Sequence, residues 1–249
     1  MANPAKIKAT VVSIKNHSEG VYAVVFRAES GFPHFKPGQF LHLSVDDFDP
    51  TLGFWPESRV FSIASRPGKD ELTIVYSVKG RYTKKIEKAL APEKSFWLKL
   101  PYGDFILDSH LKSGQDAILV AGGTGISPFI PYLETVCEKR NIINKIQLLY
   151  GVRKNKLLLF PELIRDSVKY IANFGATIYV EEELPEYPAS GNLEVNHGRL
   201  SVEDIMEKAV LLTDPVFFLS GPPMMLDTFK REMLSRGVVG ERIKIDQWD

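Results

Sequence analysis

The spacing of apolar residues divides the chain into two halves with different predicted structure. In the first half, short stretches rich in β-branched and aromatic residues are separated by turn-forming segments at residues 31–33, 36–38 and 66–68. Such runs between breakers predict β-strands, and many short strands are typical of an antiparallel barrel or sandwich. The strands are expected at residues 7–14, 21–28, 39–45, 59–64, 71–78 and 95–100, with one helix at 83–90.

Beyond residues 108–114, apolar strands alternate with helix-like stretches. Strands are expected at 117–121, 145–150, 177–180, 215–219 and 242–246, and helices at 127–139, 160–170, 201–208 and 223–236. Near-continuous apolar strands that alternate with helices predict a parallel, doubly wound sheet. We therefore expect an N-terminal antiparallel β-barrel domain, residues 1–110, followed by an α/β doubly wound parallel-sheet domain, residues 111–249.

Charge and cysteine content narrow the function classes. The 31 basic and 31 acidic residues give a formal net charge of zero, without the basic excess of a nucleic-acid binder. The single cysteine, Cys137, excludes an internal disulfide and an iron–sulfur cluster held by four thiolates of this chain. We expect no metal site. We also expect no membrane span and no signal peptide, because no apolar run is long enough. A monomer in the reducing cytoplasm is the default expectation.

A glycine-rich segment, Gly122-Gly123-Thr124-Gly125, directly follows an apolar strand. Ser127 and Pro128 then offer a hydroxyl N-cap and a proline suited to the first helical position. Glycines let a backbone approach a ligand, and free N–H groups at a helix start can bind phosphate. The spacing differs from the G-x-G-x-x-G fingerprint. A nucleotide site and a tight turn chosen for packing therefore both fit this segment.

The first half holds a second candidate segment, Arg59-Val60-Phe61-Ser62, on an apolar strand. An arginine there can pair bidentately with a pyrophosphate. An aromatic ring can lie against a flat ligand, and a serine hydroxyl can reach a ring nitrogen. For this tetrapeptide alone, an edge strand with an exposed arginine is the simpler explanation.

A third segment, Gly80-Arg81-Tyr82-Thr83, opens the helix predicted in the first half. Lys84 and Lys85 follow, although a positive charge near a helix N-terminus costs about 0.3–1 kcal/mol. An anion docked at that end would offset the cost, whereas a solvated face would also explain the lysines.

Taken in order, these segments resemble the motif series of the ferredoxin–NADP reductase superfamily. The series is Arg59-Val60-Phe61-Ser62, Gly80-Arg81-Tyr82-Thr83, Pro101-Tyr102-Gly103-Asp104-Phe105, Ala121-Gly122-Gly123-Thr124-Gly125, Tyr150-Gly151-Val152-Arg153 and Ser220-Gly221-Pro222-Pro223-Met224. The resemblance spans the chain from about residue 35 to its end. It implies that the barrel binds FAD and that the second, nucleotide-binding domain binds NADH or NADPH.

The resemblance also implies roles for single residues. Arg59 would bind the FAD pyrophosphate, with Gly80 and Thr83 on its other side. Phe61 would lie against the flavin, replacing a tyrosine of many relatives and losing its hydroxyl, and Ser62 would lie near the hydride-accepting nitrogen. The residues expected on the nicotinamide nucleotide are Gly122, Gly123, Thr124, Gly125 and Pro222. The same motifs add Val60, Arg81, Tyr82, Arg153 and Gly221 to the expected cofactor-binding residues.

Three positions near the C-terminus complete the expected catalytic set with Ser62. Ser220 stands where many relatives have a cysteine that points at the nicotinamide ring, so a changed rate is expected. Asp246 takes the place of a glutamate, although a solvated strand-end carboxylate is equally consistent with it. Trp248 is expected to bind and cover the flavin face; a frayed terminus is the alternative.

The implied function is hydride transfer from NAD(P)H to FAD, followed by electron transfer to a separate acceptor such as ferredoxin, flavodoxin or an oxygenase component. The alternatives are a reductase component of a multisubunit enzyme and a non-enzymatic flavin- or nucleotide-binding regulator. A carboxylate suits the ribose hydroxyls of NADH, and positive charge suits the extra phosphate of NADPH. Residues 181–183, all glutamate, favour NADH, while Arg153 and Lys154 favour NADPH. We expect NADH to be preferred.

Overall fold

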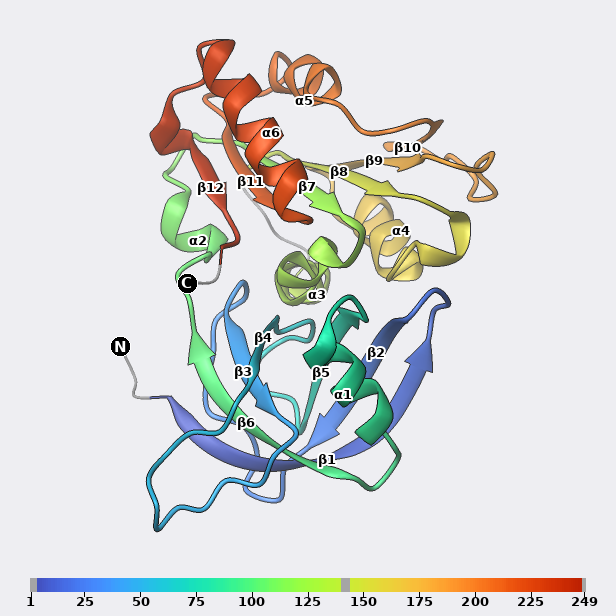
Figure 1. Cartoon of the computed structure of the whole chain (residues 1–249). Helices are drawn as coiled ribbons and strands as arrows, with labels where there is room; N and C mark the ends of the chain where they lie inside the picture. The colour runs from blue at the N-terminus through green and yellow to red at the C-terminus, as the bar shows by residue number, and fades with distance from the viewer. Residues whose placement is uncertain (1–3, 140–143, 248–249) are drawn as a thin grey trace.

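The first half of the chain is an antiparallel sheet that closes into a barrel (Figure 1). The computed structural model describes residues 4–139 and 144–247. The strands are β1 (Ala5–Asn16), β2 (Val21–Arg27), β3 (Phe40–Ser44), β4 (Arg59–Ser62), β5 (Glu71–Ser77) and β6 (Ser95–Tyr102), in the order β4-β3-β6-β1-β2-β5. The two edge strands meet, because Ile63 bridges Ile74 and the Ala64 N–H donates to the Thr73 carbonyl at 2.8 Å. The predicted antiparallel barrel is confirmed.

Side chains from alternate positions of these strands fill the barrel. Val24 and Phe26 of β2 are buried together with Leu41 of β3 and Phe96 of β6. Alternation of this kind follows from the two-residue period of a strand, which sends every second side chain inward. The helix α1 (Arg81–Ala89) adds Tyr82 and Ile86 to the same core.

The second half is a parallel sheet of six strands. They are β7 (Ala117–Gly122), β8 (Ile146–Val152), β9 (Phe174–Val180), β10 (Leu193–His197), β11 (Val216–Ser220) and β12 (Ile243–Ile245), in the order β10-β9-β8-β7-β11-β12. The order reverses direction at β7, so β7 and β11 flank the switch point where ligands bind in such sheets. The sequence did not reveal β10, because this edge strand buries only Leu193 fully.

Helices cover both faces of this sheet, as the doubly wound prediction requires. The helices α3 (Ile130–Lys139) and α4 (Pro161–Tyr170) pack on one face, and α5 (Val202–Ala209) and α6 (Pro223–Ser235) on the other. Strand β7 serves both cores, with Leu119 in one and Ile118 and Val120 in the other. Within residues 4–139 and 144–247, no helix combines the length and the apolarity needed to cross a membrane.

The helix predicted to start at Ser127 begins later. Residues Gly123–Phe129 form a 3₁₀ segment, and the α-helix starts at Ile130. Ser127 lies inside this 3₁₀ segment and not at the N-cap position of a helix, and its hydroxyl donates to the Thr124 carbonyl at 2.8 Å. The N-cap prediction was wrong because the glycine-rich segment continues in a tighter 3₁₀ turn. A short helix, α2 (Leu107–His110), which the sequence also did not reveal, joins the two halves.

The barrel packs directly on the 3₁₀ segment and α3. Val21, Ala64 and Val75 of the barrel belong to the same apolar core as Ile126 and Phe129. Polar contacts flank this core: the Lys69 ammonium lies 3.1 Å from the Glu134 carboxylate of α3, which also accepts the Arg66 N–H at 2.7 Å. The two halves therefore form a continuous interface, with the carboxyl ends of β7 and β11 facing the barrel (Figure 1).

Candidate functional site

A cavity of about 1300 Å³ lies between the barrel and the parallel sheet. Residues of five of the six sequence motifs line it, together with Asp246. The motif of residues 101–105 does not: Phe105 is buried instead, with its ring centre 5.7 Å from that of Phe129 and 5.8 Å from that of Phe218. Four predicted ligand-binding segments and the Arg153 segment are thus brought to one place, while the remaining motif serves packing.

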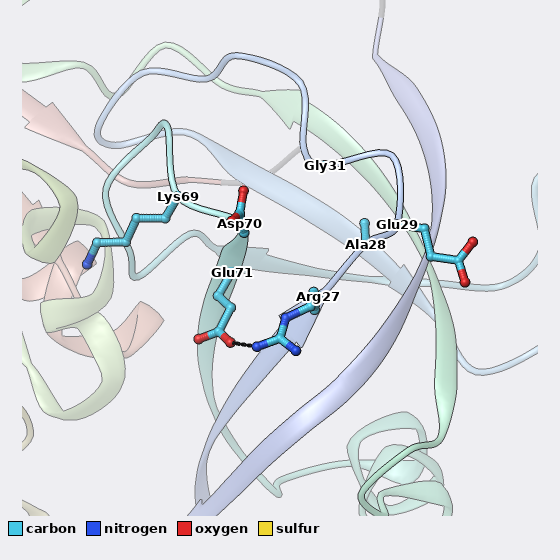
Figure 2. A pocket seen from close by; sticks show the side chains of 7 residues that line it. All are labelled: Arg27, Ala28, Glu29, Gly31, Lys69, Asp70 and Glu71. Atoms are coloured by element: carbon cyan, nitrogen blue, oxygen red, sulfur yellow. Dashed lines mark hydrogen bonds and ion pairs between the residues drawn. The ribbon is translucent and has the colours of Figure 1, made fainter.

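A smaller hollow of about 590 Å³ lies elsewhere, where β2 ends and β5 begins (Figure 2). Arg27 faces Glu71 there and forms an ion pair with it, whereas the side chains of Lys69 and Glu29 point away from this pair (Figure 2). Its charged lining residues are exposed or partly exposed, and all seven lining residues come from the barrel. The large cavity is therefore the candidate cofactor site.

Three of the four predicted catalytic residues meet inside the large cavity. Ser62 at the end of β4 donates a hydrogen bond of 3.2 Å to Asp246 Oδ2, and Ser220 at the end of β11 donates one of 2.9 Å to the same oxygen. The exposed fractions are 5% for Ser62, 3% for Ser220 and 7% for Asp246. Trp248, the fourth, lies outside the described residues.

The backbone brings Asp246 to this position. Its N–H donates to the Leu219 carbonyl of β11 at 2.9 Å, which continues the pairing of β11 with β12 by one residue. Asp246 therefore lies beside Ser220, and the Ser62 hydroxyl reaches it from the barrel. A buried carboxylate needs hydrogen-bond donors, and hydroxyls from both halves supply them. The arrangement excludes the solvated strand-end alternative for Asp246.

Arg59 is held at the cavity by three neighbours. Its guanidinium donates to the Ser58 carbonyl at 2.7 Å and to the Glu57 carboxylate at 3.1 Å, and it lies 4.5 Å from the centre of the Tyr82 ring. The Tyr82 hydroxyl points away to the barrel, where it donates to the Glu57 carbonyl and accepts the Val45 N–H at 3.2 Å. Tyr82 thus supports Arg59 with its ring, while its hydroxyl is used within the barrel.

The turn before α1 is fixed by Thr83. The Thr83 hydroxyl accepts the N–H groups of Lys79 at 2.9 Å and Gly80 at 3.0 Å, and it donates to the Gly80 carbonyl at 3.1 Å. No heavy atom lies within 4 Å of the position that a Cβ on Gly80 would take. The turn therefore presents an open backbone to the cavity. Arg81 extends into solvent next to it, with 91% of its side chain exposed.

The glycines at the switch point divide into two kinds. A Cβ on Gly125 would lie 2.3 Å from the Ser220 carbonyl oxygen, and Cβ atoms on Gly122 and Gly221 would clash with the Met225 side chain. Gly125 is therefore required by packing against backbone, whereas a side chain at Gly122 or Gly221 would displace the flexible end of Met225. Gly123 is different, because its φ of +55° favours glycine and nothing lies within 4 Å of its Cβ position. The packing explanation of the glycine-rich segment therefore holds for Gly125, while Gly123 leaves open space beside its backbone.

Tyr76 of β5 is a lining residue that the sequence did not single out. Its ring centre lies 5.7 Å from that of Phe61 and 5.6 Å from that of Tyr22. Within the described part of the chain, its buried hydroxyl has no hydrogen-bond partner, and burial raises the pKa of Tyr76. The signal was available in part, since alternation along β5 places Tyr76 on the barrel-facing side with Ile74.

The far end of the cavity is lined by charged residues that follow β8, β9 and β10. These are Arg153, Glu181 and Arg199. Glu183 instead accepts the backbone N–H of Asn155 at 3.0 Å, so it stabilises the loop after β8. Of the three consecutive glutamates, Glu181 alone is a lining residue.

Comparisons with known proteins agree with this architecture. The FAD-binding domain family model matches residues 6–149, more than half of the chain, and the oxidoreductase NAD-binding domain model matches residues 119–231. A flavohemoprotein of Bacillus subtilis (strain 168) is 24% identical over 211 residues, covering 85% of this chain and 51% of the relative. A probable flavin reductase of Aliivibrio fischeri is 28% identical over 233 residues, covering 91% and 89%.

The fold matches that of solved structures at low sequence identity. The crystal structure of a ferredoxin NADP+ reductase from Neisseria gonorrhoeae with bound FAD and NADP has a TM-score of 0.77 to this chain at 20% identity, covering 98% of each. The chain spans about half the length of the flavohemoprotein and of the other first curated relatives.

Barrel, doubly wound sheet and shared cavity together define a two-domain protein built to hold two dinucleotides. The chain belongs to the FAD-binding domain family, and its second half matches the oxidoreductase NAD-binding domain model. FAD and a nicotinamide nucleotide are the cofactors of this family's two domains.

Proposed function

We propose that this protein is an NAD(P)H-dependent flavoprotein reductase that passes a hydride from NAD(P)H to FAD and electrons onward to a separate acceptor. The observation that carries the proposal is the buried group of Ser62, Asp246 and Ser220 between the two domains. A protein that only bound flavin or nucleotide would need neither a shared carboxylate nor hydroxyls contributed by both domains. The domain boundary is placed between residues 110 and 111, at the end of α2.

The cavity fits both cofactors. Pockets for one small molecule measure about 300–1000 Å³, and this one, at about 1300 Å³, is larger. Gly80 and Gly123, one on each side, leave open space where a Cβ would stand. Exposed backbone of this kind, with an arginine nearby, suits phosphate groups. We assign the FAD pyrophosphate to Arg59, Gly80 and Thr83, with Val60, Arg81 and Tyr82 around it.

The reacting rings are assigned to the region between the two serines. Bound FAD supplies the hydride chemistry and can release electrons singly or in a pair. Phe61 offers an apolar ring to the flavin, and Thr124, Gly221 and Pro222 shape the place for nicotinamide. The protein's contribution is orientation and exclusion of water, and orientation carries much of the rate in such reactions.

The hydroxyl protons of the two serines point in a defined direction. Each hydroxyl has one proton, and both protons point to Asp246 Oδ2. Ser62 and Ser220 therefore turn their oxygen lone pairs away from Asp246, and those lone pairs can accept a hydrogen bond from a bound ring. Asp246 therefore orients the two hydroxyls and keeps their protons directed at Oδ2.

Among the two nucleotides, NADH is the proposed donor. A carboxylate beside the ribose accepts from the ribose hydroxyls and repels a 2′-phosphate. Glu181, which follows β9, the third strand of the domain, lines the cavity and supports this choice. The acceptor is proposed to be a separate protein, which the ferredoxin in the name of the Neisseria gonorrhoeae structure supports.

The test is anaerobic reduction of the purified protein loaded with FAD. We expect a yellow protein whose flavin absorbance bleaches with either nucleotide and bleaches faster with NADH. A polypeptide that takes up no FAD, or a bound flavin that stays oxidised with both nucleotides, would contradict the proposal.

A further inference from the structure

The nucleotide end of the cavity carries an ion-pair cluster that joins the two domains. Glu19 belongs to the barrel, and each of its carboxylate oxygens takes one cation of the other domain. Oε2 lies 2.7 Å from Arg153 Nη2, and Oε1 lies 2.7 Å from Lys154 Nζ. Glu19 is partly buried in this contact, with 24% of its side chain exposed.

The backbone at Glu19 is specialised for this position. Glu19 lies in the turn between β1 and β2, where Ser18, Glu19 and Gly20 have φ values of +85°, +50° and +72°. Non-glycine residues rarely adopt such values, and each costs free energy. The strained turn brings the tip of the β1–β2 hairpin beside the loop that follows β8 (Figure 1).

The cations that Glu19 holds are those that the sequence associates with NADPH. Arg153 and Lys154 follow β8, and Arg153 lines the cavity together with Glu181. Positive charge at this end of the sheet would accommodate a 2′-phosphate. Glu19 pairs with both cations, and its single negative charge offsets one of their two positive charges. A residue from the barrel therefore lowers the positive charge at this end of the sheet.

The charges of the whole cluster balance. Lys154 also lies 3.8 Å from Glu182, and Arg199 lies 4.0 Å from Glu181. Three cations therefore face three carboxylates in this set of ion-paired side chains. Removing the charge of Glu19 leaves the cluster with one positive charge, next to a cavity that accepts a phosphorylated nucleotide.

We propose that Glu19 of the FAD-binding barrel sets the nucleotide preference of the other domain, by occupying the two cations that would otherwise bind the 2′-phosphate of NADPH. The inference rests on the proposed function, because it assigns the nucleotide to this cavity. The hydrogen bond with Lys154 lowers the pKa of Glu19 and raises that of Lys154, so the pair stays charged at neutral pH.

The competing explanation is that Glu19 merely joins the domains, and the chain offers a matched control for it. Glu134 of α3 also joins the domains, through Lys69 and the Arg66 N–H, but neither of these partners lines the cavity, whereas Arg153, a partner of Glu19, does. Glu134→Gln therefore weakens a comparable interdomain contact without changing the charge at the nucleotide end.

The experiment measures binding of nucleotide fragments to the FAD-loaded protein by calorimetry. Adenosine 2′,5′-bisphosphate carries the 2′-phosphate, and 5′-AMP lacks it. In Glu19→Gln, the affinity for the bisphosphate is expected to rise about tenfold, since two charge-assisted contacts become available, while that for 5′-AMP stays the same. The gain should shrink as salt is raised and should vanish in Glu19→Gln/Arg153→Gln. The ratio of kcat/KM for NADPH to that for NADH should rise in parallel.

Other outcomes would overturn the proposal. These are an unchanged bisphosphate affinity in Glu19→Gln, an equal gain for both fragments, or the same gain in Glu134→Gln. Should Glu19→Gln fold poorly, Glu19→Asp replaces it, because its shorter side chain cannot hold both cations and should give a smaller gain in the same direction. Fragment binding requires no hydride transfer. An unreactive flavin would therefore contradict the proposed function, while the binding of the two fragments would still test the Glu19 inference.

Discussion

Ser220 donates a hydrogen bond of 2.9 Å to Asp246, a partner that lies beyond the adjacent strand β12 and is itself 7% exposed. The pair differs from the cysteine and glutamate that the motif series leads one to expect at these positions. Ser220 and Asp246 form a hydroxyl–carboxylate contact, and the same carboxylate oxygen also accepts from Ser62. The three side chains therefore form one connected site.

Replacement of Ser220 tests this contact. Ser220→Ala removes one of the two hydroxyl donors to Asp246, and we expect the rate of flavin reduction by NADH to fall about tenfold. FAD binding should be unchanged, because the flavin is assigned to the barrel. Ser220→Cys restores a group that can donate weakly and should lose less. Stopped-flow absorbance would measure the rates, and equal losses in the two variants would argue against a hydroxyl role.

Arg59 and Tyr82 should act together in FAD binding. Arg59→Lys keeps the charge but loses the planar fork that matches a pyrophosphate, so the dissociation constant for FAD should rise about tenfold. Tyr82→Phe keeps the ring beneath Arg59 and should bind FAD more tightly than Tyr82→Leu, which removes the ring. Fluorescence titration of the apoprotein would measure these constants. Equal weakening in both Tyr82 variants would show that the ring does not position Arg59.

The two kinds of glycine predict two kinds of defect. Gly125→Ala places a methyl group against the Ser220 carbonyl, and overpacking of this sort costs about 1–3 kcal/mol of unfolding free energy. Gly123→Ala meets no atom but must adopt a φ of +55°, at a cost of about 1–2 kcal/mol, and its methyl group enters the cavity. We therefore expect weaker nucleotide binding in Gly123→Ala at comparable stability loss. Denaturant unfolding and calorimetry separate the two effects.

Tyr76→Phe should stabilise the protein or leave its stability unchanged. The Tyr76 hydroxyl is buried without a partner among residues 4–139 and 144–247, and such a group costs about 1–3 kcal/mol. Removal of the hydroxyl keeps the ring contacts with Phe61 and Tyr22. Thermal unfolding of the apoprotein would measure the change. A clear loss of stability would mean that the hydroxyl forms a bond through an ordered water.

Local patterns predicted most strands and helices, because a strand or helix depends on residues near in sequence. The edge strand β10 and the 3₁₀ segment before α3 were not predicted, since pairing and packing determine them. Ser62, Ser220 and Asp246 could be named individually from motifs. The sequence could not show that both serines donate to one oxygen of Asp246, because this contact depends on how the barrel sits on the sheet. Glu19 carried no sequence signal at all, since its partners lie more than 130 residues away.

The two hydrogen bonds at Asp246 depend on different parts of the fold. Ser220 and Asp246 belong to adjoining parts of one sheet, whereas Ser62 belongs to the barrel. The Ser220 bond therefore requires only that β11 and β12 pair, while the Ser62 bond also requires the barrel to sit correctly on the sheet. A substitution that disturbs the domain interface should consequently weaken the Ser62 bond before the Ser220 bond.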